Sequence, residues 1–315
     1  MSDMKDRQLI SVVMATYNGE KYLAEQIESI LNQTHDNFEL ICIDDCSGDS
    51  TFDILTEFKK RFPGKISVYS NDKNLGSRKN FERACGYASG KYIAFSDQDD
   101  WWYPHKLEKL HKKIIQNQKL AFVYSNAQLV DKNLSIVKES VWDRDTKPFK
   151  GSDFYNVVYE NMVMGCTILA RASFVHETLP FPDKGLHQDW YMAMMAKGLN
   201  YEVDFVNEAL IKYRQHEGNV VSRKKQFKKK SGYKERTLRR WFEVSLLDYS
   251  KFRDSKLRGI LECKEAMLKN ILEKRPFLAY RYFRAFYERL REVNAVNHKI
   301  KRSDFRLILR GVFFR

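Results

Sequence analysis

The chain has 315 residues, 43% of them hydrophobic and 14% aromatic, and it carries a formal net charge of +14. This composition excludes a disordered protein, because so many apolar side chains fill one large core, or one domain with a smaller appendage. No apolar run approaches the roughly 20 residues that a membrane-spanning helix needs, and the N-terminus has no hydrophobic signal core. We therefore expect a globular, cytoplasmic protein.

Short apolar and β-branched runs predict strands at residues 9–15, 38–43, 66–70 and 91–96. Between them, apolar residues at helical spacing predict helices at 20–32, 52–62 and 77–88. Strands and helices that alternate with short connections are typical of an α/β fold with a mostly parallel sheet and helices on both faces.

The pattern is less regular beyond residue 104. A helix at 104–117 and a strand at 120–125 are followed by an irregular stretch from 131 to 160. We expect a strand at 163–171, a helix after 187–190 and strands at 201–206 and 209–214. From about residue 222 the chain becomes strongly charged and helix-rich.

Polar clusters follow three of the predicted strands. They are Thr16-Tyr17-Asn18, Asp44-Asp45 and Asp97-Gln98-Asp99-Asp100. Ligands of such sheets bind at the carboxyl ends of the strands, so we expect the clusters to converge on one crevice. Asp44-Asp45 suits a base or ribose, although a simple turn at this position is an alternative.

The acidic cluster places three carboxylates within four positions, and these repel one another unless a positive charge lies among them. In extended backbone, Asp97 and Asp99 project to the same side and can share one divalent cation. Mg²⁺ or Mn²⁺ suits oxygen ligands, and phosphates of a substrate often complete the coordination shell. The alternative is a loop cluster that favours the start of the next helix, near Pro104. We expect Asp100 to cap that helix or to support the site from behind.

The five cysteines include the pair Cys42 and Cys46, whose spacing resembles that of metal ligands. Cys42 lies inside an apolar strand-like run, however, and the sequence has no second pair. We therefore expect buried or incidental thiols rather than a disulfide framework or a zinc site.

Three stretches of the chain resemble the inverting nucleotide-sugar glycosyltransferases of family 2, which have the GT-A fold. They are "ISVVMATYNGEKYLAEQIESILNQTHDNFELICIDDCSGDST", "NLGSRKNFERACGYASGKYIAFSDQDDWW" and "HQDW". The resemblance covers roughly residues 9–216, and "SDQDDWW" with "YRQHEGNVV" is most similar to the bacterial rhamnosyltransferase branch. It implies a GT-A domain at 1–220, with a nucleotide-binding half at about 1–125 and an acceptor half at about 126–220. A basic helical C-terminal extension would occupy 221–315.

The resemblance also implies roles by position. Residues at the nucleotide would be Thr16, Tyr17, Asn18, Asp45, Arg78 and Asp97, with Asp45 accepting a hydrogen bond from the base. Asp99 would be the principal metal ligand, and Asp97 would contact the ribose or the metal. His216 would contact the diphosphate or complete the metal shell, although a loop histidine with ordinary hydrogen bonds is an alternative.

Asp189 matches the catalytic base of the family. The residue before it is usually Glu, whereas this chain has Gln188. The acceptor would be contacted by His187, Gln188 and Trp190, although His187 also fits a plain helix start. The indoles of Trp101, Trp102 and Trp190 suit either a sugar-stacking platform or a core.

The implied reaction is the transfer of one sugar from dTDP-rhamnose or a UDP-sugar to a saccharide acceptor. The acceptor would be lipid-linked, in the synthesis of a capsule, O-antigen or exopolysaccharide. A direct displacement inverts the anomeric centre. The alternatives are a nucleotidyl- or phosphotransferase with the same aspartate-metal site, and a non-catalytic scaffold that binds membrane or polysaccharide.

The positive charge is concentrated in the last third of the chain. Residues 221–315 hold 28 Lys and Arg against 10 Asp and Glu, whereas residues 1–220 hold 27 against 31. We expect an anionic membrane surface as the partner, with plain solvated helices as the alternative and no nucleic acid. The end, "FRLILRGVFFR", suits an interfacial helix. The protein would thus be peripheral on the inner face of the cell membrane.

Overall fold

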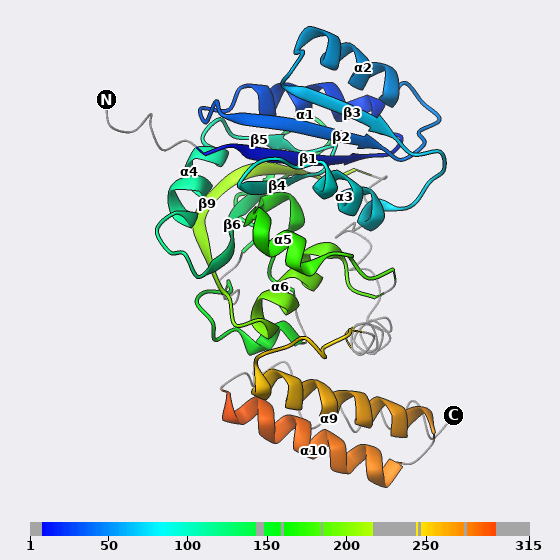
Figure 1. Ribbon diagram of the computed structural model, residues 1–315, viewed down its shortest axis with the longest axis vertical. Coiled ribbons are helices and arrows are strands. Elements are labelled where there is room, and N and C mark those ends of the chain that lie inside the picture. Colours follow the sequence, from blue (N-terminus) through cyan, green and yellow to red (C-terminus); the bar gives the residue numbers. More distant parts are fainter. Residues whose placement is uncertain are drawn as a thin grey trace. The chain divides into compact units, whose positions relative to one another are not determined.

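The computed structural model describes residues 8–142, 148–158, 161–183, 185–216, 244, 247–273 and 276–293 (Figure 1). The chain divides into two compact units. The first comprises Met1–Lys150, Met162–Asp183 and Glu202–Ser222, and the second comprises Gly151–Asn161, Lys184–Tyr201 and Arg223–Arg315. The predicted boundary at residue 220 remains a prediction.

The first unit is built on one sheet of nine strands among the described residues. The strands are β1 (Ile10–Thr16), β2 (Phe38–Asp44), β3 (Ile66–Ser70), β4 (Tyr92–Ser96), β5 (Trp101–Trp102), β6 (Leu120–Val130), β7 (Ile136–Lys138), β8 (Ile168–Arg171) and β9 (Glu202–Arg214). Their order is β3-β2-β1-β4-β8-β6-β9-β5, with β7 paired to β6. Strands β3, β2, β1 and β4 are parallel, whereas β8 is antiparallel to both β4 and β6. The predicted mostly parallel α/β sheet is confirmed.

Five helices of this unit flank the sheet: α1 (Glu20–Leu31), α2 (Thr51–Arg61), α3 (Ser77–Gly86), α4 (Lys106–Ile114) and α5 (Ala172–Thr178). Helix α1 buries the apolar stripe that its sequence spacing predicts, which is Leu23, Ile27 and Ile30; α2 buries Leu55 and Phe58 of its stripe, whereas Phe52 is exposed. Helix α3 packs on β1 and β2, and α4 packs on β6 and β9. Burial of these stripes holds the carboxyl ends of β1, β2 and β4 in a fixed arrangement.

Some elements differ from the prediction. Residues 201–206 and 209–214 were predicted as two strands, but they belong to one strand, β9. The polar, exposed Asn207 and Glu208 between them form a bulge, at which the register of β9 with β6 shifts and the strand continues. The run at 163–171 begins as a 3₁₀ turn (Gly165–Thr167), and only Ile168–Arg171 is a strand. The short elements β5 and α5 were not predicted, since two and seven residues carry little periodic signal.

The second unit contains α6 (Gln188–Gly198), α9 (Ser255–Leu272) and α10 (Pro276–Glu292). Helices α9 and α10 lie side by side (Figure 1) and bury apolar residues such as Ile260, Phe283 and Phe286. An ion pair between Lys197 and Asp254 is buried in this unit. The predicted helical character of the last third is confirmed in these helices, whereas the basic run at 223–240 lies outside the described residues. No described helix is both long and apolar enough to cross a membrane.

Candidate active site

The predicted polar clusters follow three adjacent strands. Strand β1 pairs in parallel with β2 on one side and with β4 on the other, which places Thr16 opposite Asp44. The backbone N–H of Asp45 donates to the carbonyl of Thr16 at 2.8 Å. Thr16 itself is buried and its hydroxyl donates to Asp44 at 3.1 Å. The buried Thr16 therefore links the ends of β1 and β2 by hydrogen bonds, and it is not placed to make the predicted contact with a base.

Gln98 binds the main chain of Tyr17. Its Oε1 accepts from the Tyr17 N–H at 2.8 Å, and its Nε2 donates to the Tyr17 carbonyl at 3.0 Å. A side chain at Gly19 would not fit beside this amide, because a Cβ there would lie 2.3 Å from Gln98 Oε1. The clamp leaves the Tyr17 side chain 48% exposed at the strand end. No sequence motif predicts this role of Gln98, because a neutral amide between aspartates has no recognisable pattern of its own.

Asn18 is part of the same turn and has a left-handed backbone, with φ of 47°. Its N–H donates to the Ser47 hydroxyl, and its Oδ1 accepts from the Gly48 N–H, both at 2.9 Å. Asn18 thus holds the turn after β1 to the turn after β2. Asp44 forms this second turn by accepting from the N–H and the hydroxyl of Ser47, so the predicted turn is present.

The carboxylate of Asp45 holds the loop that leads into α3. Its Oδ1 accepts from Asn71 Nδ2 at 2.6 Å and from the Leu75 N–H at 2.8 Å, and its Oδ2 accepts from the Gly76 N–H at 2.8 Å. A carboxylate offers about four lone-pair positions, so Oδ2 retains capacity for one further donor. Arg78, in the first turn of α3, is half-buried and donates to the carbonyl of Asp183 at 2.9 Å.

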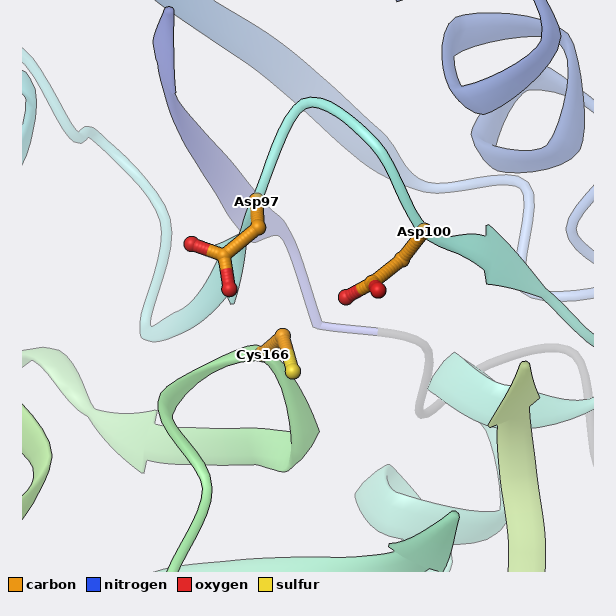
Figure 2. Close-up of side chains that lie close together, drawn as sticks. All are labelled: Asp97, Asp100 and Cys166. Carbon is orange, nitrogen blue, oxygen red and sulfur yellow. The ribbon is translucent and has the colours of Figure 1, made fainter. Parts of the chain in front are cut away.

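The acidic loop, residues 97–100, joins β4 to β5. The chain bends at Gln98 and Asp99, so the alternation expected of extended backbone does not hold there. The carboxylate of Asp100 lies near that of Asp97. One ligand atom each of Asp97, Asp100 and Cys166 lies within 4.8 Å of the other two. Figure 2 shows that these three side chains lie close together.

Asp100 is buried and does not cap α4, whose N-cap residue is His105. Its Oδ1 accepts from the Arg214 N–H at 3.2 Å, and its Oδ2 accepts from no nitrogen or oxygen donor of the described residues. Burial, and then the charges of Asp99 and Asp97, raise the pKa of Asp100 well above its usual range. Of the two predicted roles, the cap of α4 is thus not observed, and support of the site from behind stays a prediction.

The side chain of His216 reaches the acidic loop from the far end of the unit's sequence. Its Nε2 lies 2.7 Å from Oδ2 of Asp99, and both side chains are half-buried. Its ring packs against Tyr22 of α1, with centroids 4.9 Å apart. Both the predicted contact with a metal or diphosphate and the alternative of a loop histidine with ordinary hydrogen bonds are compatible with these two contacts of His216.

Two buried cations near the acidic loop were missed by analysis of the sequence. Arg214 donates through Nε to the Asp99 carbonyl at 2.7 Å. Lys106 donates to the Cys166 carbonyl at 2.6 Å, and its Nζ lies 3.1 Å from the centroid of a Trp102 ring. Burial lowers the pKa of Lys106 to about 7. In these two hydrogen bonds the basic side chains bind main-chain carbonyls, of Asp99 and Cys166, and no carboxylate of the loop.

The donor groups at the acidic loop fit a hard divalent cation. Carboxylates of Asp97, Asp99 and Asp100 and the imidazole of His216 are ligands that Mg²⁺ or Mn²⁺ accepts. The buried Oδ2 of Asp100, without a nitrogen or oxygen donor among the described residues, is an atom that a cation would satisfy. Burial, with Asp100 and Asp97, raises the pKa of the Cys166 thiol, and a soft sulfur ligand suits Mg²⁺ or Mn²⁺ less well than oxygen does.

Asp189 belongs to the second unit, where it lies in the first turn of α6. It is half-buried, and its Oδ1 accepts from the Trp190 N–H at 2.6 Å. His187, the N-cap residue, is exposed, and Gln188 is half-buried. The Trp190 side chain is 6% exposed and its Nε1 donates to the Val157 carbonyl at 2.7 Å. Trp190 is therefore an interior aromatic residue, which does not fit the predicted acceptor contact.

The two tryptophans after the acidic loop differ. Trp102 is fully buried in the core. Trp101 is half-buried and lines a surface cleft of about 450 Å³ with Glu25, Glu28 and Asn32 among its other residues. Of the predicted platform, only Trp101 has an accessible face.

Comparison with known proteins places the chain in a family. Residues 11–175 match the model of Glycosyl transferase family 2. The uncharacterized glycosyltransferase MJ1057 of Methanocaldococcus jannaschii is 33% identical over 234 residues, which cover 72% of this chain and 78% of the relative. The UDP-Glc:alpha-D-GlcNAc-diphosphoundecaprenol beta-1,3-glucosyltransferase WfgD of Escherichia coli is 31% identical, covering 70% and 82%. The dTDP-rhamnosyl transferase RfbG of Shigella flexneri is 31% identical, covering 69% and 76%.

Solved structures share the fold. The crystal structure of S. aureus TarS 1-349 in complex with UDP-GlcNAc has a TM-score of 0.62 at 20% identity, covering 97% of this chain and 90% of that chain. The mannosyltransferase PcManGT from Pyrobaculum calidifontis, in complex with GDP-Man and Mn²⁺, has a TM-score of 0.57 at 16% identity, covering 98% and 80%. The chain therefore belongs to glycosyl transferase family 2 and is a nucleotide-sugar glycosyltransferase with the GT-A fold.

Proposed function

We propose that this glycosyltransferase is metal-dependent and inverting, and that it transfers one sugar from a nucleotide donor to a saccharide acceptor. The observation that carries the proposal is the pairing of His216 with Asp99, in the loop that also holds Asp97, at the carboxyl end of β4. It gathers carboxylate and imidazole ligands where sheets of this kind bind nucleotides.

The nucleotide would lie over the strand ends of β1 and β2. The exposed ring of Tyr17 suits stacking on a base, and the remaining lone pair of Asp45 Oδ2 suits a base N–H. Arg78 and Asn18 remain assigned to the nucleotide by their positions. These roles rest on family position and on the placement of each side chain.

The cation would be held by Asp97, Asp99 and His216, and the buried Oδ2 of Asp100 would be a further ligand. When bound, Mg²⁺ or Mn²⁺ acts as a Lewis acid that stabilises the leaving nucleoside diphosphate. The Mn²⁺ in the PcManGT complex supports this choice of metal. The protein contributes half-buried side chains, between which charges interact more strongly than in water.

Asp189 would remove the proton from the attacking hydroxyl of the acceptor. A single displacement of the diphosphate by that hydroxyl inverts the anomeric carbon, and it requires one carboxylate base and no second carboxylate as nucleophile. His187, exposed at the start of α6, and Gln188 remain assigned to the acceptor.

The donor is proposed as a UDP-sugar or dTDP-rhamnose, and the acceptor as a lipid-linked saccharide of bacterial surface polysaccharide synthesis. The printed names of WfgD and RfbG support these choices, since one specifies UDP-Glc with a diphosphoundecaprenol acceptor and the other a dTDP-rhamnosyl donor. Membrane association through the basic C-terminal region would bring the enzyme to such an acceptor.

The test is release of nucleoside diphosphate from a panel of UDP- and dTDP-sugars, with Mg²⁺ or Mn²⁺ and extracted lipid-linked acceptors. We expect turnover with one donor class, loss of turnover on chelation by EDTA, and loss in Asp99→Asn. Turnover that survives both EDTA and Asp99→Asn would remove the metal from the mechanism.

A further inference from the structure

Arg214, the last residue of β9, is a buried arginine with contacts to several separate segments. Its side chain is 2% exposed. Nε donates to the carbonyl of Asp99 at 2.7 Å, and one Nη donates to the carbonyl of Lys132 at 2.7 Å. The other Nη forms an ion pair with Glu25 of α1. The backbone N–H donates to Asp100.

These contacts close a ring of residues around the candidate metal site. The guanidinium carbon lies 4.5 Å from the centroid of the Tyr22 ring, and Tyr22 packs against His216. His216 pairs with the carboxylate of Asp99, whose carbonyl is bound by Arg214. Each member therefore limits the position of the next.

The contact between Arg214 and Asp99 leaves the Asp99 carboxylate available to a cation. Arg214 binds the main-chain oxygen of Asp99, so this contact occupies none of the lone pairs of that carboxylate. A guanidinium directs its donors along fixed, coplanar directions, which suits the joining of three segments at once. A lysine presents one nitrogen and makes no such fork.

We propose that Arg214 is a positioning residue, which holds the acidic loop and His216 in the geometry that binds the cation. This inference rests on the proposed function, because it takes Asp99 and His216 as metal ligands. Arg214 touches neither substrate nor metal in this account. It acts through the carbonyl of Asp99, the carboxylate of Asp100 and the ring of Tyr22.

The test measures Mn²⁺ affinity by the electron paramagnetic resonance signal of free Mn²⁺, in the full chain with UDP or dTDP present. Outer-shell partners of metal ligands typically change affinity by about 10- to 100-fold, and we expect a loss of this size in Arg214→Lys. The matched control is Arg171→Lys. Arg171 is also buried and donates to the carbonyls of Leu120, Ile114 and Asn117.

Both substitutions remove guanidinium–carbonyl bonds, so both should lower the melting temperature, but only Arg214→Lys should weaken Mn²⁺ binding. Wild-type Mn²⁺ affinity in Arg214→Lys, together with loss in Asp99→Asn, would refute the positioning role. Wild-type affinity in Asp99→Asn would instead refute the proposed function.

If Arg214→Lys does not fold, Glu25→Gln provides the second variant. It keeps the size of the side chain and removes the charge that pairs with Arg214. We expect a severalfold loss of Mn²⁺ affinity in this variant, and an unchanged affinity would count against the proposal.

Discussion

The Nε2 atom of His216 lies 2.7 Å from Oδ2 of Asp99, although the two residues are 117 positions apart in the chain. The contact joins the end of β9 to the loop after β4, and so brings the two halves of the first unit's sheet to one point. A histidine and a carboxylate in contact are ligands for a common cation, or a hydrogen-bonded pair that orients each partner. Both uses agree with the proposal that the cation binds at the acidic loop.

The first prediction concerns the fit between Gly19 and Gln98. Gly19→Ala should displace the Gln98 amide, because the new Cβ would meet it at 2.3 Å, and the Tyr17 main chain would lose two hydrogen bonds. We expect affinity for UDP or dTDP to fall by about 10-fold, which corresponds to about 1.4 kcal/mol. Calorimetric titration measures the change.

A double-mutant cycle tests the cause of that loss. In the Gln98→Ala background, Gly19→Ala should cost little more, because the amide with which the methyl collides is gone. Additive losses in the double variant would show that Gly19 acts independently of the clamp.

The second prediction concerns Lys264, which is buried in the second unit and donates to the Val158 carbonyl at 2.8 Å. Burial lowers its pKa to about 7, whereas an unfolded lysine has a pKa of about 10.4. Between these values the unfolded state binds more protons, so the free energy of unfolding should rise with pH. This residue should contribute a rise of about 2 kcal/mol between pH 7 and 9.

Urea denaturation at pH 7 and pH 9 measures this effect. Lys264→Met should abolish this contribution. At pH 7 the variant should have the larger free energy of unfolding, and this advantage over the wild type should shrink as pH rises. Lys269→Met, on the exposed side of the same helix, is the matched control and should leave the pH dependence unchanged. An identical pH dependence in Lys264→Met and wild type would contradict the lowered pKa.

The third prediction concerns the exposed basic residues of α10. Arg281 and Arg284 lie on its exposed surface, near the exposed Tyr280. Each basic residue near an anionic surface contributes about 1 kcal/mol to binding, so Arg281→Glu with Arg284→Glu should weaken binding to phosphatidylglycerol vesicles by at least 10-fold. Cosedimentation measures the bound fraction.

The control for vesicle binding is Lys59→Glu with Lys60→Glu, which changes net charge equally at the exposed end of α2. This pair should reduce binding little. Equal losses in the two double variants would indicate a general effect of net charge, and no loss in either would remove α10 from the membrane contact.

Local patterns in the sequence predicted much of the fold. The four parallel strands and the polar residues at their ends follow from apolar runs and from the rule for strand carboxyl ends. Each of these strand and helix patterns lies within 5 to 12 consecutive residues. Tertiary packing did not change the secondary structure that they predict.

The contacts between side chains at the candidate site could not be predicted from local patterns, because they join residues far apart in the sequence. Gln98 meets Tyr17 from 81 positions away, and Arg214 meets the Asp99 carbonyl from 115. Asp97 and Asp99 do not follow the period of two expected of a strand, because the backbone bends at residues 98 and 99. The burial of Lys106 could not be predicted, because lysine is rarely buried and a lysine in a sequence is expected at the surface.

The most direct test of the central claim separates binding from chemistry at Asp189. With the donor that the panel identifies, Asp189→Asn should lower kcat by about 100- to 10,000-fold, as loss of a general base does. Its affinity for Mn²⁺ and nucleoside diphosphate should match that of the wild type, and Glu262→Gln, at an exposed carboxylate of α9, should leave both unchanged. Nucleoside diphosphate release at the wild-type rate by Asp189→Asn would contradict the account.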